Sequence, residues 1–221
     1  MSNQVAQQSA LFDRYLRLIT EWNKRFNLTR ITSPDEIRIK HFNDSLTYAE
    51  AIKFAGFDLN QPLKVADVGS GAGFPGIPLK IIYPHWNMTL IEATSKKCDF
   101  LNEVIKQLAL TGITVLNSRA ENLYSKPSVA LAKEGRAVQF DVVVARAVAP
   151  LEKLTTWCLP LCEVLITQKC QKELATPRCH PGRRRGDPGY SISVKEFIRE
   201  NKNLRVKLLS LEKKVFVCIS R

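Results

Sequence analysis

A short apolar run that ends in an aspartate and leads straight into alternating glycines constrains this chain more than any other stretch. The run ends at Asp67, and glycines follow at Gly69, Gly71 and Gly73. A second apolar run ends at Glu92, 25 residues after Asp67. In α/β folds such a turn lets the backbone approach a ligand closely, and a carboxylate at the end of the next strand accepts hydrogen bonds from ribose hydroxyls. The pattern therefore predicts an α/β sheet that binds a nucleoside-containing cofactor.

Apolar runs and amphipathic stretches alternate along the chain from Leu63 onward. Such alternation is typical of a doubly wound, mostly parallel sheet with helices on both faces. Its ligand site should lie at the carboxyl ends of the first strands, where Gly69 and Glu92 occur. The patterns predict strands at 63–68, 88–92, 113–117, 140–145, 162–167 and 214–219, with a closing hairpin over 206–219, and helices at 75–82, 95–111, 120–135 and 150–159.

The first 60 residues have a helical pattern instead. Apolar residues recur at helical spacing over 9–26, Ser33 and Pro34 mark a second helix start, and a third amphipathic stretch runs from Asp44 to Gly56. The apolar residues of the first stretch, Trp22 and Phe26 included, are expected to pack in the core. The chain thus divides into a helical extension over 1–60 and a cofactor-binding domain over 61–221.

The chain is strongly basic, with a formal net charge of +12 and a pI of about 9.6. A phosphate-rich partner such as a nucleic acid explains this charge most simply, and a solvated basic surface is the alternative. The candidate cations for phosphate groups in the first hundred residues are Lys24, Arg25, Arg30, Arg38, Lys40, Lys96 and Lys97.

Several sequence features bear on the compartment and on metals. The N-terminus lacks the pattern of a secretory signal, and no apolar run is long enough to span a membrane, so we expect a cytoplasmic monomer with no membrane partner. In that compartment the six cysteines are expected to be reduced thiols. Cys158 and Cys162 are four residues apart and Cys179 precedes His180, but no C-x-x-C pair occurs, so no metal site is expected.

The glycine turn is compatible with more than one cofactor. Gly71, Gly73 and Gly76 match the spacing used for nicotinamide dinucleotides, whereas the absence of a following Gly-Lys-Ser/Thr excludes a phosphate loop. S-adenosylmethionine needs close backbone approach, an anion for its ammonium group and a ribose clamp. Gly69, Asp67 and Glu92 respectively suit these needs.

Six blocks of the sequence are distinctive when taken in order: Trp22–Thr29, His41–Leu46, Asp67–Leu79, Leu90–Lys97, Arg119–Glu121 and Phe140–Ala149. Together they resemble one family, the bacterial ribosomal RNA small-subunit methyltransferase G family, formerly called glucose-inhibited division protein B. The resemblance covers about residues 10–168 and is most specific in the Gly-Phe-Pro-Gly-Ile-Pro-Leu run. It implies a Rossmann-like class I methyltransferase fold with a doubly wound, mostly parallel seven-stranded α/β sheet and an N-terminal helical extension.

The resemblance also implies an activity and a set of site residues. Members of the family transfer a methyl group from S-adenosylmethionine to N7 of a guanine in the 530 loop of 16S ribosomal RNA, free or within the 30S subunit. The implied cofactor-binding residues, with those suggested by the turn, are Asp67, Gly69, Gly71, Gly73, Phe74, Glu92, Ala93, Thr94, Ala120, Glu121 and Arg146. The expected catalytic group is Arg146, His41, Asp44 and Lys169.

The target atom determines the chemistry that these residues would perform. Guanine N7 has an in-plane lone pair and no proton, so the enzyme needs positioning rather than a general base. We therefore assign Arg146 to guanine O6, a phosphate or the cofactor carboxylate; an ion pair at a strand end is the structural alternative. Without the family, His41 and Asp44 would be interpreted as a helix-surface pair. The alternatives for the whole chain are an inactive RNA-binding relative and an NAD-dependent oxidoreductase.

The chain departs from the family pattern near its end. Lys169 is kept after the fifth predicted strand, but Cys170 stands where the family has glycine. Residues 170–200 do not resemble the family and are rich in proline, glycine and arginine, so we interpret them as an atypical basic loop.

Overall fold

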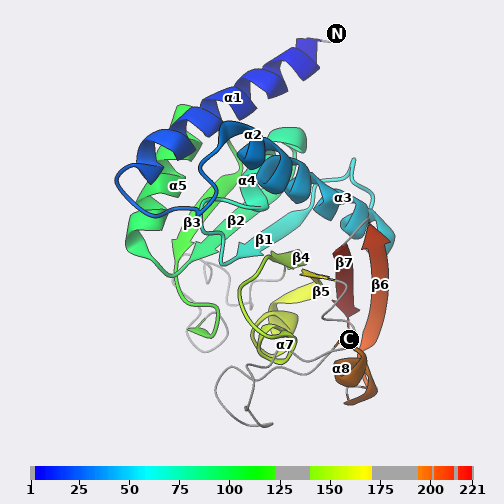
Figure 1. The fold of residues 1–221 in the computed structure, drawn as a ribbon. Coiled ribbons are helices and arrows are strands. Elements are labelled where there is room, and N and C mark those ends of the chain that lie inside the picture. The colour runs from blue at the N-terminus through cyan, green and yellow to red at the C-terminus, as the bar shows by residue number, and fades with distance from the viewer. Residues whose placement is uncertain (1–2, 123–139, 171–193, 201, 212–213, 221) are drawn as a thin grey trace, which may run out of the picture.

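A computed structural model describes residues 3–122, 140–170, 194–200, 202–211 and 214–220. Its centre is a seven-stranded sheet in the order β3-β2-β1-β4-β5-β7-β6 (Figure 1). The first five of these strands are parallel, and β7 is antiparallel to both β5 and β6. The strands are β1 Lys64–Val68, β2 Asn87–Glu92, β3 Ile113–Asn117, β4 Phe140–Ala145, β5 Cys162–Cys170, β6 Arg205–Leu211 and β7 Lys214–Ser220.

Helices cover both faces of this sheet because successive residues of each strand point to opposite sides. In β4, Val142 and Val144 face one core, whereas Val143 and Ala145 face the other. The first core is closed by α1, α3, α4 and α5, and the second by α7 and α8. The helical elements are α1 Asn3–Asn23, α2 Pro34–Ile37, the π-helix η1 Arg38–Asn43, α3 Asp44–Ala55, α4 Gly76–Ile82, α5 Ser95–Gln107, α7 Leu151–Cys158, the 3₁₀ turn η2 Leu159–Leu161 and α8 Val194–Glu200.

The predicted fold class is confirmed, and the strand bounds agree to within a few residues. The atypical loop assigned to 170–200 is wrong at both ends, because residue 170 is the last of β5 and 194–200 form α8. Residues 171–193 lie outside the described part of the chain, as does most of the helix expected at 120–135.

Three N-terminal segments pack against the sheet domain (Figure 1). Helix α1 begins earlier than predicted and ends at Asn23. Helix α2 begins after Ser33, as predicted, but the Ser33 side chain makes no capping hydrogen bond. Gly56 ends α3 in a left-handed conformation, with φ +113°. The division at residue 60 stays a prediction, although α1 and α3 share one core with the sheet.

Candidate active site

The glycine turn after β1 is tight and left-handed. Gly69, Gly71 and Gly73 have φ values of +70°, +59° and +95°, which side chains with a Cβ rarely adopt. The amides of Gly69 and Ser70 donate to the Ile91 carbonyl at 2.8 and 3.1 Å, which joins the turn to the end of β2. A Cβ added at Gly69 would lie 2.5 Å from Val148 Cγ2, because the chain turns back over it after β4. The turn therefore leaves no room for a side chain at Gly69.

Asp67 lies below this turn and is fully buried. Its Oδ2 accepts a hydrogen bond of 2.9 Å from the Gly76 amide, at the first residue of α4. Burial raises the pKa of the carboxyl to about 7, against the lowering by the Gly76 bond and by Arg146. Oδ1 is buried and has no hydrogen-bond partner among the described residues. Its predicted contact with a cofactor ammonium stays a prediction.

The Glu92 carboxylate is held by two backbone amides. Oε2 accepts from Gly71 at 2.9 Å and Oε1 accepts from Thr94 at 2.8 Å. The residue is only 7% exposed. Each carboxylate oxygen can accept two hydrogen bonds, so one acceptor position on each oxygen remains after these two contacts. The carboxylate is thus fixed in orientation and still able to bind a pair of hydroxyls.

A cavity of about 290 Å³ opens beside this carboxylate, at the carboxyl ends of β1, β2 and β3. We call it the Glu92 pocket. Five predicted residues line it: Gly69, Glu92, Ala93, Ala120 and Glu121. The sequence did not predict the apolar side of the pocket that Val148 and Trp157 provide, from the segment after β4 and from α7. The full lining is Val68, Gly69, Ile91, Glu92, Ala93, Ser118, Arg119, Ala120, Glu121, Val148 and Trp157.

A second group of predicted residues gathers around the guanidinium that follows β4. We call Arg146, His41, Asp44 and Phe74 the Arg146 cluster. Arg146 donates from Nη2 to His41 Nδ1 at 3.2 Å, and its Nη1 lies 3.9 Å from Asp44 Oδ2. The guanidinium carbon lies 5.1 Å from the centre of the Phe74 ring, and the His41 ring stacks on Phe74 at 4.5 Å. The N-terminal helices therefore bring His41 and Asp44 to a strand end more than 100 residues away.

The contacts of His41 define its protonation state. Arginine only donates, so His41 Nδ1 must be the acceptor, and the proton of a neutral ring is on Nε2. Nε2 lies 2.9 Å from Thr29 Oγ1 and donates to it. Burial, followed by the nearby Arg146 charge, lowers the His41 pKa to about 4. The imidazole is therefore neutral at pH 7, with its lone pair already used.

Two buried tyrosines connect the N-terminal helices to this edge of the sheet. The Tyr15 hydroxyl of α1 donates to the Ala72 carbonyl in the glycine turn, and Tyr48 of α3 donates to the Ala145 carbonyl at 3.0 Å. Burial raises the pKa of both hydroxyls well above 10, so both stay protonated donors. The two loops that frame the site are thus held by the extension.

The other predicted residues lie outside these two groups. Gly71 and Gly73 shape the turn, and Thr94 precedes α5 with its amide on Glu92. Lys169 is in β5, paired with Val215 of β7, and its catalytic role stays a prediction. Within the described ranges, no three His, Cys, Asp or Glu side chains group so as to hold a metal ion. None of the described helices combines the length and apolarity that crossing a bilayer requires.

Comparison with known proteins identifies the family. Residues 8–172 match the model of the rRNA small subunit methyltransferase G family. The chain belongs to that family. Its match spans every residue of the Glu92 pocket and of the Arg146 cluster.

Individual relatives of the methyltransferase G family agree with this assignment. Ribosomal RNA small subunit methyltransferase G of Lactiplantibacillus plantarum is 42% identical over 162 residues, which cover 72% of this chain and 62% of that protein. The protein of the same name from Desulforamulus reducens is 44% identical over 153 residues, covering 69% of this chain and 59% of its own length. The chain thus spans about 60% of the length of these relatives.

The fold of this family member also resembles a solved methyltransferase. Magnesium protoporphyrin IX methyltransferase from Synechocystis PCC 6803, solved with bound S-adenosylmethionine, superposes with a TM-score of 0.53 at 16% identity. The match covers 97% of both chains. At this level of identity the likeness concerns the fold, which is that of class I methyltransferases.

Proposed function

We propose that the chain transfers a methyl group from S-adenosylmethionine to N7 of a guanine in the 530 loop of 16S ribosomal RNA. The observation that carries the proposal is the family match over residues 8–172, which contains both groups of site residues. The partner is then 16S ribosomal RNA, free or in the 30S subunit, and the chain acts as a cytoplasmic monomer. The net charge of +12 supports a polyanionic substrate.

The residues present fit the proposed cofactor. The two remaining acceptor positions of Glu92 suit the ribose hydroxyls, and Ala93, Ala120 and Val148 provide apolar surface for the nucleoside. Asp67 Oδ1 is a buried acceptor without a partner among the described residues and suits an ammonium group. The cofactor supplies an electrophilic methyl group on a sulfonium, and the chain supplies binding and orientation.

The Arg146 cluster fits a reaction that needs no proton transfer. Guanine N7 attacks through its own lone pair, so no base is required. His41 cannot act as that base while its Nδ1 accepts from Arg146. Arg146 has further N–H donors for guanine O6 or a phosphate, and Asp44 and His41 hold it in place. The cluster therefore positions a guanine rather than deprotonating one.

One contact argues against the NAD-dependent alternative. In dinucleotide-binding folds the pyrophosphate lies at the N-terminus of the helix that follows the glycine turn. Here the Asp67 carboxylate accepts the Gly76 amide at that position, and Gly76 is buried. This amide is therefore already paired and is not free to donate to a pyrophosphate. The geometry therefore favours S-adenosylmethionine over a dinucleotide.

The proposal is tested with the purified chain, labelled S-adenosylmethionine and 30S subunits or 16S RNA from cells that lack the modification. We expect label in the RNA, and a stop at one guanine in primer extension after reduction and aniline cleavage. Thermal-shift assays should show stabilisation by S-adenosylhomocysteine and none by NAD. Binding of RNA and cofactor without any transfer would instead support the inactive relative and contradict the proposal.

A further inference from the structure

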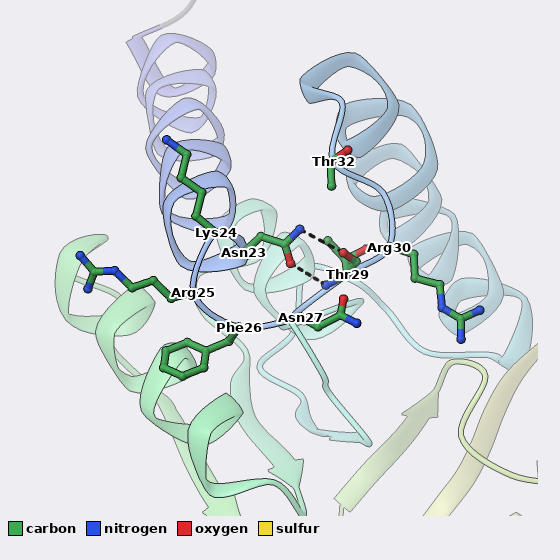
Figure 2. A pocket seen from close by; sticks show the side chains of 8 residues that line it. All are labelled: Asn23, Lys24, Arg25, Phe26, Asn27, Thr29, Arg30 and Thr32. Atoms are coloured by element: carbon green, nitrogen blue, oxygen red, sulfur yellow. Dashed lines mark hydrogen bonds between the residues drawn. The ribbon is translucent and has the colours of Figure 1, made fainter.

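A second hollow lies between the end of α1 and the start of α2 (Figure 2), and it shares no lining residue with the Glu92 pocket. We call it the basic pocket. Its volume is about 520 Å³. Figure 2 shows Lys24 and Arg25 extending on one side and Arg30 on the other. The residues that line it are Asn23, Lys24, Arg25, Phe26, Asn27, Thr29, Arg30 and Thr32.

The loop that forms this pocket is held in one shape by a single amide side chain. Asn23 Oδ1 accepts from the backbone amides of Leu28 and Thr29 at 2.8 and 3.1 Å, and Asn23 Nδ2 donates to the Thr29 carbonyl at 3.0 Å. Phe26 packs on Trp22, which packs in turn on Phe100 of α5. The pocket is therefore preorganised, which lowers the entropic cost of binding.

The lining is cationic and has no carboxylate. Lys24, Arg25 and Arg30 are exposed, and none of the three forms an ion pair with another described residue. By contrast, the nearby Lys40 and Arg38 are paired with Glu36 and Asp13. The three lining cations are thus free to meet an anionic ligand.

The pocket is connected to the candidate reaction site by hydrogen bonds. Thr29, in its wall, accepts from His41 Nε2 at 2.9 Å, and His41 Nδ1 accepts from Arg146 at 3.2 Å. The pocket and the guanidinium thus lie two side-chain contacts apart. A polymer that presents a guanine at Arg146 would bring its neighbouring backbone toward this loop.

We propose that the basic pocket binds the sugar-phosphate backbone of the RNA strand beside the target guanine. This inference rests on the proposed function. Lys24, Arg25 and Arg30 contact phosphates, while Asn27 and Thr32 offer hydrogen bonds to sugar or base groups. Phe26 is half-buried, and Lys96 Nζ lies over one face of its ring at 5.3 Å from the centre, so only the other face can offer a stacking surface to a base.

The mixed lining favours RNA over other anionic partners. A membrane surface would select apolar side chains at the rim, and the exposed rim residues here are polar or charged. A single inorganic phosphate would fill only a small part of 520 Å³. A strand with successive phosphates and exposed bases uses the cations, the amides and the ring together.

The test compares two triple variants with equal loss of charge. The first is Lys24→Gln with Arg25→Gln and Arg30→Gln. The control is Lys53→Gln with Lys106→Gln and Lys207→Gln, which are exposed residues on α3, α5 and β6. We measure the Kd for 530-loop RNA between about 50 and 200 mM salt, the methyl-transfer rate and the Kd for S-adenosylhomocysteine.

We expect the pocket variant to bind RNA about tenfold or more weakly and its salt slope to fall by about 1–2, since each single-strand phosphate contact contributes roughly 0.7. Its affinity for S-adenosylhomocysteine should match that of the unmodified chain, and the control should lose less than about threefold in RNA affinity. Equal losses of RNA affinity in both variants, or an unchanged RNA affinity and salt slope in the pocket variant, would overturn the inference. Absence of methyl transfer by the unmodified chain would overturn the proposed function instead.

Discussion

Two groups of residues meet at the carboxyl end of the sheet and are built in different ways. The Glu92 pocket is lined only by residues between 68 and 157, and its carboxylate is oriented by backbone amides. The Arg146 cluster is made of side chains, and half of them, His41 and Asp44, come from the N-terminal helices. Burial lowers the pKa of both Arg146 and His41. The pocket therefore depends on the local conformation of the chain, and the cluster depends on the docking of distant helices.

This difference suggests that the Glu92 pocket and the Arg146 cluster have separate functions. A glycine turn and a carboxylate at neighbouring strand ends can hold a nucleoside in many α/β proteins. The cluster, by contrast, requires the π-helix η1 and α3 to lie over β4. We therefore expect changes in the pocket to act on cofactor affinity, and changes in the cluster to act on turnover. The following predictions separate the two.

The largest effect is expected for Gly69→Val. The residue has φ +70° and its added Cβ would meet Val148 at 2.5 Å, so the turn must change shape. Calorimetry should show at least about a 100-fold loss of S-adenosylmethionine affinity. Gly56→Ala is the matched control, because its φ is also positive but nothing lies within 4 Å of the added atom. Circular dichroism verifies that both variants fold; equal cofactor affinity in a folded Gly69→Val would contradict the pocket.

A similar loss, but in turnover, is expected for Arg146→Lys. Lysine keeps the charge but cannot contact His41, Asp44 and a substrate with a planar fork. We expect kcat to fall about 100-fold, roughly 2.7 kcal/mol, with the cofactor Kd changed less than threefold. The control is Arg14→Lys on α1, whose partner is Gln107. A parallel loss of cofactor affinity would place Arg146 in the pocket rather than in the cluster.

Glu92→Ala should have a smaller effect, confined to cofactor affinity. The change removes acceptors for ribose and also releases the Gly71 and Thr94 amides. The expected cost is about 1–3 kcal/mol, or roughly five- to 150-fold in Kd. Glu163→Ala, an exposed position in β5, is the control. A lower kcat at saturating cofactor would show that the two groups are not separate.

The smallest expected effect is a proton released on cofactor binding. Asp67 has a raised pKa of about 7 in the cofactor-free chain, and a nearby ammonium would lower it. Binding at pH 7 should then release up to about half a proton, and affinity should rise with pH through that pKa. Calorimetry in buffers of different ionisation enthalpy measures this release. Asp67→Asn should abolish it, and no release from the unmodified chain would remove Asp67 from the ammonium site.

Much of the fold could be predicted from the sequence, because β1, β2 and β4 are apolar runs bounded by turn residues. Gly69 and Glu92 of the Glu92 pocket were predictable for the same reason, whereas Ala93, Ala120 and Glu121 came from the family resemblance. Val148 and Trp157 were missed, since an apolar residue after a strand carries no signal of the cavity it lines.

The arrangement of the Arg146 cluster was less predictable. His41, Asp44 and Arg146 came from the family resemblance, and their contacts depend on how helices distant in sequence dock. No local pattern predicts the π-helix η1 or the bond between Thr29 and His41. Trp22 packs against the core as expected, whereas Phe26 belongs to neither core cluster, so its expected core position was wrong and it lines the basic pocket instead.

The alternation of side chains along β4 has a consequence for the guanidinium that follows it. Val144 faces α1 and α3 and Ala145 faces α7, so Arg146 follows in the position that points back toward the N-terminal helices. Inserting or deleting one residue within β4 would reverse this order and direct the guanidinium to the opposite face of the sheet. The hydrogen-bond register of β4 with β1 and β5 thus decides which layer of the protein can reach the substrate.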